Sequence, residues 1–212
     1  MVETLTTRQV SMAAENGDTL SPEQEIIRYI SKFAPLSDAE IRGILENIKI
    51  RTFKKGETLL REGQVASLCY FILKGCVRQY YLVDGEEKTT HFYTEGQPIA
   101  PYEGTYKGKP SKFYLSCVED SIMTVGTPDD EAKLFEKFPH FEAISRLAVE
   151  EELGKSQERF SSFVINSPEE RYLDLLKTRP ELLDRVPQYQ LASFLGVTPE
   201  SLSRIRKRIM IR

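Results

Sequence analysis

The spacing of hydrophobic residues changes twice along the chain. After a polar stretch at residues 1–20, which we expect to form a loose tail, apolar residues recur every three or four positions as far as Ile48. This spacing predicts two short helices. Each begins with a capping-box pattern, the first at Ser21 and the second at Ser37, so these two serines are the expected N-caps.

Between residues 49 and 127 the hydrophobic period shifts toward two, and glycine-containing turns interrupt the chain at short intervals. Regular short strands separated by such turns predict an antiparallel, double-stranded β-helix, that is, a jelly-roll barrel. The strand-like runs lie at residues 68–73, 76–83, 89–93, 112–118 and 122–125, and the turns contain Gly56, Gly63, Gly75, Gly85, Gly96 and Gly108.

The helical period returns after Pro128, so the fold class is α+β. We expect a short helix at residues 129–135, a long helix from 139 to about 163, a hinge at 166–170 with Ser167 as the next N-cap, and a further helix at 171–177. Spacings of four and three on the long helix predict a weak coiled-coil-like dimer seam. A helix that packs only on its own barrel is the alternative. The seam would consist of Val149, Leu153, Ser156, Phe160 and Phe163.

The C-terminal segment has the spacing of a helix-turn-helix. A first helix at residues 188–195 ends at Gly196, and a second begins after Thr198, a natural N-cap, with Pro199 at its first position. Apolar residues at spacings of three and four bury one face of the second helix. The opposite face could enter a DNA major groove, and it carries Glu200, Ser203, Arg204, Lys207 and Arg208.

Composition narrows the class of protein. The chain has 212 residues, 40% of them hydrophobic and 29% charged, with a net charge of -3, which is typical of a soluble globular protein and not of a nonspecific nucleic-acid binder. We expect a cytoplasmic location without membrane association, because no apolar run approaches the roughly 18 residues of a membrane span. Three cysteines predict reduced thiols, and two separated histidines, His91 and His140, give no metal pattern.

The order and length of these elements resemble the Crp/Fnr superfamily of bacterial transcription regulators. Residues 53–63 and 70–78 look like the opening strands of that family's cyclic-nucleotide-binding fold, and the helix-turn-helix matches its output domain. The resemblance implies a tail (1–20), a sensor domain (21–138), a dimerisation helix (139–165) and a DNA-binding domain of winged-helix type (166–212). It also implies a homodimer, a double-stranded DNA operator and RNA polymerase as partners.

The resemblance also suggests roles for individual residues of the second helix. The family's base-reading motif, Arg-Glu-Thr-x-x-x-Arg, is represented by residues 199–205, in which Glu200 and Arg204 match and Pro199 replaces the first arginine. Glutamate accepts from a cytosine amine and arginine donates to guanine. The remaining candidates for DNA contact, several of them to phosphates, are Gln188, Tyr189, Thr198, Ser201, Ser203, Lys207 and Arg208.

The expected nucleotide pocket departs from the family's pattern. In the family a glutamate holds the ribose hydroxyl and an arginine pairs with the cyclic phosphate, but residues 96–103 and 110–113 lack both matching residues. We therefore expect no bound cyclic nucleotide and no cofactor. A pocket for another small molecule is one interpretation and an ordinary core is the other. Such a pocket would draw on Ile99, Tyr102, Glu103, Ser111, Lys112 and Phe113.

Two further functions compete with DNA binding. A regulatory module that acts through protein contacts is favoured by the few residues after Arg208, too few for the family's two-stranded wing. An enzyme is disfavoured, because the sequence contains no phosphate-binding glycine loop, nucleophile elbow or histidine-centred constellation.

Overall fold

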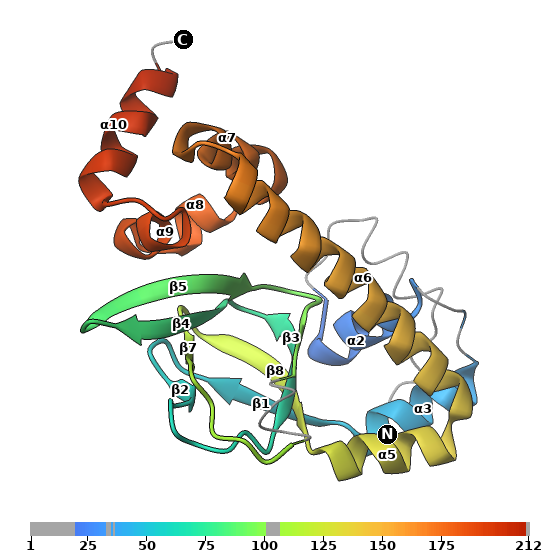
Figure 1. The fold of residues 1–212 in the computed structure, drawn as a ribbon. Helices are drawn as coiled ribbons and strands as arrows, with labels where there is room; N and C mark the ends of the chain where they lie inside the picture. Colours follow the sequence, from blue (N-terminus) through green and yellow to red (C-terminus); the bar gives the residue numbers. More distant parts are fainter. Residues whose placement is uncertain (1–19, 33–34, 36, 101–106, 211–212) are drawn as a thin grey trace.

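The computed structural model describes residues 20–32, 35, 37–100 and 107–210. The predicted tail at residues 1–19 lies outside this range. Two short helices precede the sheets, α2 (Pro22–Ile30) and α3 (Asp38–Asn47), and both predicted capping boxes are present at Ser21 and Ser37. Ile26, Ile30 and Ile44 pack together with Leu73 of the sheet region, so these helices close one end of the roll (Figure 1).

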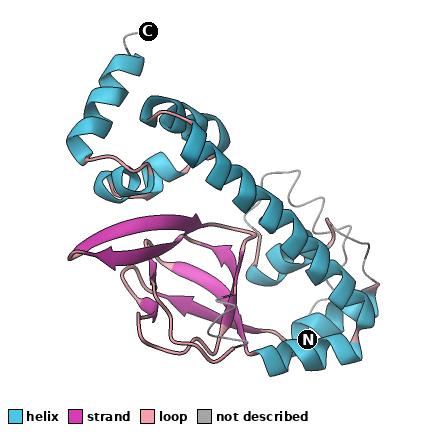
Figure 2. Ribbon diagram, in the orientation of Figure 1, coloured by secondary structure: helices cyan, strands magenta, loops and turns pink. Residues whose placement is uncertain are grey.

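Within the described residues, eight antiparallel strands form two four-stranded sheets, drawn in magenta in Figure 2. One sheet has the order β1-β8-β3-β6 and the other the order β2-β7-β4-β5. Apolar side chains of both sheets meet between them and form the core of the roll. The strands are β1 (Lys49–Phe53), β2 (Thr58–Leu60), β3 (Cys69–Lys74), β4 (Val77–Val83), β5 (Glu86–Tyr93), β6 (Pro98–Ile99), β7 (Tyr114–Cys117) and β8 (Ser121–Gly126).

The predicted turn glycines are confirmed. All six named glycines between the strands adopt positive φ, and Gly75 shows the clearest need for glycine. A Cβ added to Gly75 would lie 2.7 Å from the Cα of Ser121, so no other residue fits this corner without moving the backbone.

The predicted antiparallel, double-sheet roll is confirmed, but the described strands do not close into a barrel. In the described residues the two sheets remain open, and β5 is the edge strand of its sheet. A helix covers this edge, since Ser193 of the C-terminal region hydrogen-bonds to the backbone of β5. Edge groups satisfied by a helix need no further strand, which gives a physical reason for the open roll.

Helices make up the rest of the chain. The long helix α6 runs beside the roll and buries Ile144 and Ala148. Helix α5 precedes it near α3, and α7 to α10 gather at its far end above β4 and β5 (Figure 1). The predicted capping box at Ser167 is present, and α8 was not expected from the sequence pattern. The helices are α5 (Pro128–Lys137), α6 (Pro139–Ile165), α7 (Pro168–Thr178), α8 (Leu182–Arg185), α9 (Gln188–Phe194) and α10 (Pro199–Met210).

Candidate functional site

Helices α9 and α10 are joined by the short turn that the sequence predicts. Gly196 has φ +68° and its N–H donates to the carbonyl of Ser193 at 3.0 Å, while the N–H of Val197 donates to the carbonyl of Ala192 at 3.0 Å. These bonds satisfy carbonyls at the end of α9. The Thr198 hydroxyl accepts from the N–H of Ser201 at 3.2 Å, which confirms the predicted N-cap of α10.

The two helices bury the residues that the spacing placed inward. Ala192 has no exposed surface, so the small residue lies where the helices meet. Each helix contributes large apolar side chains to one cluster, which includes Leu191, Leu195, Leu202 and Ile205. The opposite face of α10 is consequently directed outward, and α10 lies at the periphery of the molecule (Figure 1).

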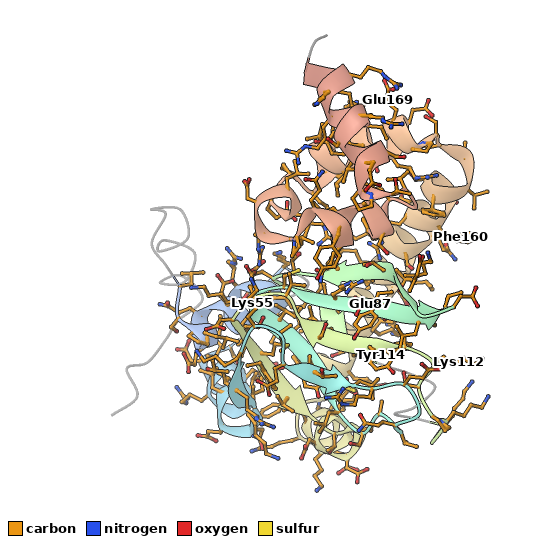
Figure 3. All side chains as sticks on the ribbon, turned by 90° about the vertical axis from the view of Figure 1, so that its left-hand side faces the viewer. Lys55, Glu87, Lys112, Tyr114, Phe160 and Glu169 are labelled. Atoms are coloured by element: carbon orange, nitrogen blue, oxygen red, sulfur yellow. The ribbon has the colours of Figure 1, made fainter. Side chains whose placement is uncertain are left out.

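That outward face carries most of the predicted DNA contacts. Glu200, Arg204 and Lys207 are exposed, and Ser203 is half-buried. Arg208 is exposed but forms an ion pair with Glu169 of α7, with 2.8 Å between Nη1 and Oε2. Figure 3 shows Glu169 in the upper helical region, close to α10. Phosphate binding by Arg208 would therefore compete with an intramolecular partner.

The charge of Glu200 suits a hydrogen-bond acceptor. Its carboxylate accepts hydrogen bonds from its own backbone N–H and from the Thr198 hydroxyl, and Arg204 adds a favourable charge, so the pKa of Glu200 lies below its usual value. The side chain consequently stays ionised near neutral pH, as acceptance from a cytosine amine requires.

The other predicted contacts surround the start of the two helices. Gln188 is exposed, and Tyr189 exposes 56% of its surface with its hydroxyl accepting from Gln190 at 3.1 Å. Thr198 is exposed but already caps α10, and Ser201 is half-buried in that cap. Thr198 and Ser201 therefore also stabilise the start of α10.

The predicted seam residues are all exposed in the single chain. Ser156 is exposed, and the exposed fractions are 41% for Val149, 58% for Leu153 and 70% for Phe160. Phe160 points outward in Figure 3. Phe163 differs from the others, because its ring also lies against Gly196 and under the guanidinium of Arg171 at 4.5 Å.

Four of the residues predicted to line an effector pocket lie within the described part of the chain, and two of them, Ile99 and Phe113, belong to the core cluster of the roll. Ile99 is buried, and Phe113 is half-buried with its ring centroid 5.8 Å from that of Tyr81. The Ser111 hydroxyl is satisfied by the backbone of Phe113 at 2.9 and 3.1 Å, and Lys112 is exposed at the rim of the roll (Figure 3). Tyr102 and Glu103 lie outside the described residues.

The roll interior contains a polar group that the sequence reasoning missed. The Tyr93 hydroxyl donates to Gln79 Oε1 at 3.0 Å, and the ring centroid of His91 lies 4.1 Å from that of Tyr93. Nε2 of His91 is buried without a hydrogen-bond partner in the described residues. Burial, with Arg159 and Arg179 nearby, lowers the pKa of His91 to about 3. Alternation along residues 89–93 would have placed His91 on the same face as Tyr93.

A polar cavity of about 740 Å³ separates α6 and α7 from the turn between β5 and β6. Its charged side chains largely pair with one another, as Arg159 does with Glu152 at 2.8 Å and Lys155 with Glu151 at 2.5 Å. Among the described residues no group of three His, Cys, Asp or Glu side chains could hold a metal ion. No described helix is both long and apolar enough to cross a membrane.

Comparisons with known proteins agree with this architecture. Residues 50–137 match the family model of the cyclic nucleotide-binding domain. No curated protein matches the chain in sequence.

Three solved structures illustrate the shared fold. The global regulator CLP of Xanthomonas campestris, described as c-di-GMP responsive, has 17% identity and a TM-score of 0.64, with 82% of this chain and 92% of that chain covered. FixK2 of Bradyrhizobium japonicum has 18% identity and a TM-score of 0.63, with 77% and 85% covered. A CooA mutant of Carboxydothermus hydrogenoformans has 16% identity and a TM-score of 0.61, with 79% and 78% covered. At these identities the likeness shows the fold.

Proposed function

Because the chain contains a cyclic nucleotide-binding domain and has the fold of Crp/Fnr-like regulators, we propose that it is a dimeric, sequence-specific DNA-binding transcription regulator. One observation carries the proposal. Helices α9 and α10 bury the apolar positions of a helix-turn-helix and leave Glu200, Arg204 and Lys207 on an exposed face. A helix of this kind reads base edges in the major groove.

Dimerisation is supported by α6. Its apolar stripe is exposed along several turns, with Leu153 and Phe160 at 58% and 70%. Exposed apolar residues at seam spacing are typical of a helix that pairs with a second copy. Two copies of α10 would then read half-sites about 34 Å apart, one turn of B-DNA.

We further propose that the roll does not bind cyclic AMP. Lys112, the only predicted pocket cation, is exposed at the rim, and the Ser111 hydroxyl is occupied by the backbone of Phe113. Inside the described roll, His91 and Tyr93 are uncharged polar groups, and the nearby Arg159 and Arg179 already pair with Glu152 and Glu181, so none of them is an unpaired cation for a cyclic phosphate.

Selection of bound duplexes from a random pool, with and without cyclic AMP, tests these statements. We expect a two-fold symmetric site that is the same in both conditions. Enrichment of no sequence would instead favour a module that acts through protein contacts, and a site that changes with the nucleotide would refute the proposal for the roll.

A pair of arginine variants tests the role of α10. Arg204→Ala should lose about 1–3 kcal/mol at one base position of each half-site. Arg206→Ala is the matched control, because Arg206 is also exposed but lies two positions further along the helix and therefore on another face. Equal weakening of all sequences by Arg204→Ala would assign Arg204 to phosphate contact.

A further inference from the structure

The C-terminal helices share a hydrophobic core with the roll. Phe92 of β5 is fully buried, and its ring centroid lies 5.3 Å from that of Phe194 in α9. Cys76 and Val118, at the turns next to β4 and β7, belong to the same cluster as Leu191 and Leu202. Helices α7 to α10, here called the helical unit, therefore pack on the outer face of their own roll, as Figure 1 shows for α9 above β5.

Ser193 fixes α9 to the edge of this sheet. Its hydroxyl accepts from the N–H of Thr89 at 2.9 Å and donates to the carbonyl of Glu87 at 2.9 Å. Both backbone groups belong to β5, the edge strand, and Figure 3 shows Glu87 on the strand that faces the helices. One side chain thus satisfies two edge groups of the sheet.

A buried arginine of the neighbouring strand β4 also binds β5. Arg78 of β4 is 2% exposed, donates from Nε to the Thr89 hydroxyl at 2.8 Å and pairs with the Glu87 carboxylate. Its guanidinium lies 4.4 Å from the ring centroid of Tyr80, which stacks on Tyr114. The β5 residues that meet Ser193 are therefore fixed by the roll itself.

Two arginines of the helical unit bind the end of β5 and the residues that follow β5 and β7. Arg179 donates to the carbonyl of Phe92 at 2.9 Å and to the Thr94 hydroxyl at 3.1 Å. Arg185 of α8 donates to both carboxylate oxygens of Glu95, at 2.9 and 2.8 Å, and from Nε to Glu119 at 2.9 Å. Bidentate pairing of this kind defines orientation as well as contributing energy.

This docking leaves the recognition face free. Arg204 and Lys207 are exposed while Ser193, one helix earlier, is bound to β5. We propose that Arg179, Arg185 and Ser193 are positioning residues that hold the helical unit on the roll of its own chain, so that α10 is presented at a fixed position for DNA reading. The inference rests on the proposed function. Beyond that function, we infer that the protein binds an operator with two half-sites when the helical unit is docked on the roll.

Docking should affect DNA binding because it defines the distance between the two recognition helices of a dimer. Two recognition helices bind a palindrome together only if their separation is defined, and the apparent affinity falls with the fraction of molecules in the competent arrangement. A single half-site requires no defined separation. Docking should therefore affect the full site strongly and the half-site little.

Arg185→Gln in the full-length dimer provides the test. Glu119→Gln is a second docking variant, because it weakens the ion pair between Arg185 and Glu119 by a change in the roll. Arg146→Gln is the matched control, since Arg146 is an exposed arginine of α6 that pairs only with Glu150 of its own helix in the described residues. The first readout is hydrogen exchange of the Thr89 amide, whose acceptor is Ser193. We expect faster exchange in both docking variants and unchanged exchange in the control.

The second readout is affinity for the selected palindrome and for an isolated half-site. Because the apparent affinity for the palindrome falls with the docked fraction, we expect the docking variants to bind the palindrome roughly tenfold more weakly, with half-site affinity unchanged. Unchanged Thr89 exchange, or equal losses on both duplexes, would overturn the inference. If the wild type selects no duplex, the proposed function fails, and Thr89 exchange still decides whether the unit is docked.

Discussion

Phe160→Ala is the most direct perturbation of the proposed dimer. Phe160 lies at the centre of the C-terminal half of the stripe on α6 and exposes 70% of its surface in the single chain. Alanine is the best helix former, so the substitution removes the aromatic ring without weakening α6. A loss of association would then report on the interface itself.

The magnitude follows from the exposed fraction. Full burial of a phenylalanine side chain contributes about 1.5–3 kcal/mol, so covering the exposed 70% contributes about 1–2 kcal/mol in each copy. A symmetric dimer contains the residue twice, which gives about 2–4 kcal/mol. The dimer dissociation constant should therefore rise by roughly 30-fold to 1000-fold.

Sedimentation equilibrium over a concentration series measures this constant. Leu147→Ala is the control, because Leu147 is also apolar and 42% exposed on α6 but lies two residues before Val149, on another face of the helix. We expect that variant to dimerise like the wild type. A Phe160→Ala protein with an unchanged constant, or a Leu147→Ala protein that dissociates equally, would refute the assignment of this face to the dimer.

Two further predictions concern stability. Gly196→Ala should destabilise the protein by at least about 1–2 kcal/mol, because φ is +68° and the new Cβ would lie 3.0 Å from the ring of Phe163. The midpoint of thermal unfolding should fall by a few degrees. An unchanged midpoint would contradict the expected strain at this turn. His91 should make the protein less stable in mild acid. Its folded pKa of about 3 lies below the unfolded value of 6.5, so the unfolded chain binds the proton first and about 2 kcal/mol is lost between pH 7 and 5. Urea unfolding of His91→Asn should lack this part of the pH dependence, and an identical pH dependence would show that His91 is accessible to protons when folded.

The features predicted from the sequence are those with local causes. Ser21, Ser37 and Ser167 cap helices through groups three residues away, so a short pattern was enough to place them. The turn at Gly196 and the cap at Thr198 likewise depend on neighbouring residues. The resemblance to the Crp/Fnr superfamily, which was drawn from such motifs, is confirmed at the level of the fold.

The features that escaped prediction depend on distant residues or on weak patterns. Strand β1 has Phe53 as its one buried residue, so it lacks the alternation that marks a strand. Ser193 and Thr89 are 104 positions apart, and nothing local indicates that they meet. Arg78 belongs to a residue type that usually faces water, yet it is buried between neighbouring strands, and Nε2 of the half-buried His91 is also covered.

Phe163 and Arg171 connect the proposed dimer seam to the proposed DNA-reading turn. Arg171 donates to the carbonyl of Leu195 from Nε at 3.1 Å and from Nη2 at 2.9 Å, and to the carbonyls of Phe163 and Asn166 at 3.1 and 2.9 Å. It therefore bridges the break after α6, where the sequence predicted a hinge, to the end of α9. Phe163 lies under this guanidinium, touches the turn at Gly196 and keeps 47% of its surface exposed on the seam.

A second copy that covered Phe163 would consequently press on the turn that orients α10. The helical unit is thus fixed on one side to the roll through Arg185 and Ser193, and on the other side to α6 through Arg171. With both sides bound, α10 cannot change its direction independently. A movement of the recognition helix would therefore either break one of these two sets of contacts or shift β5 or the end of α6 together with it.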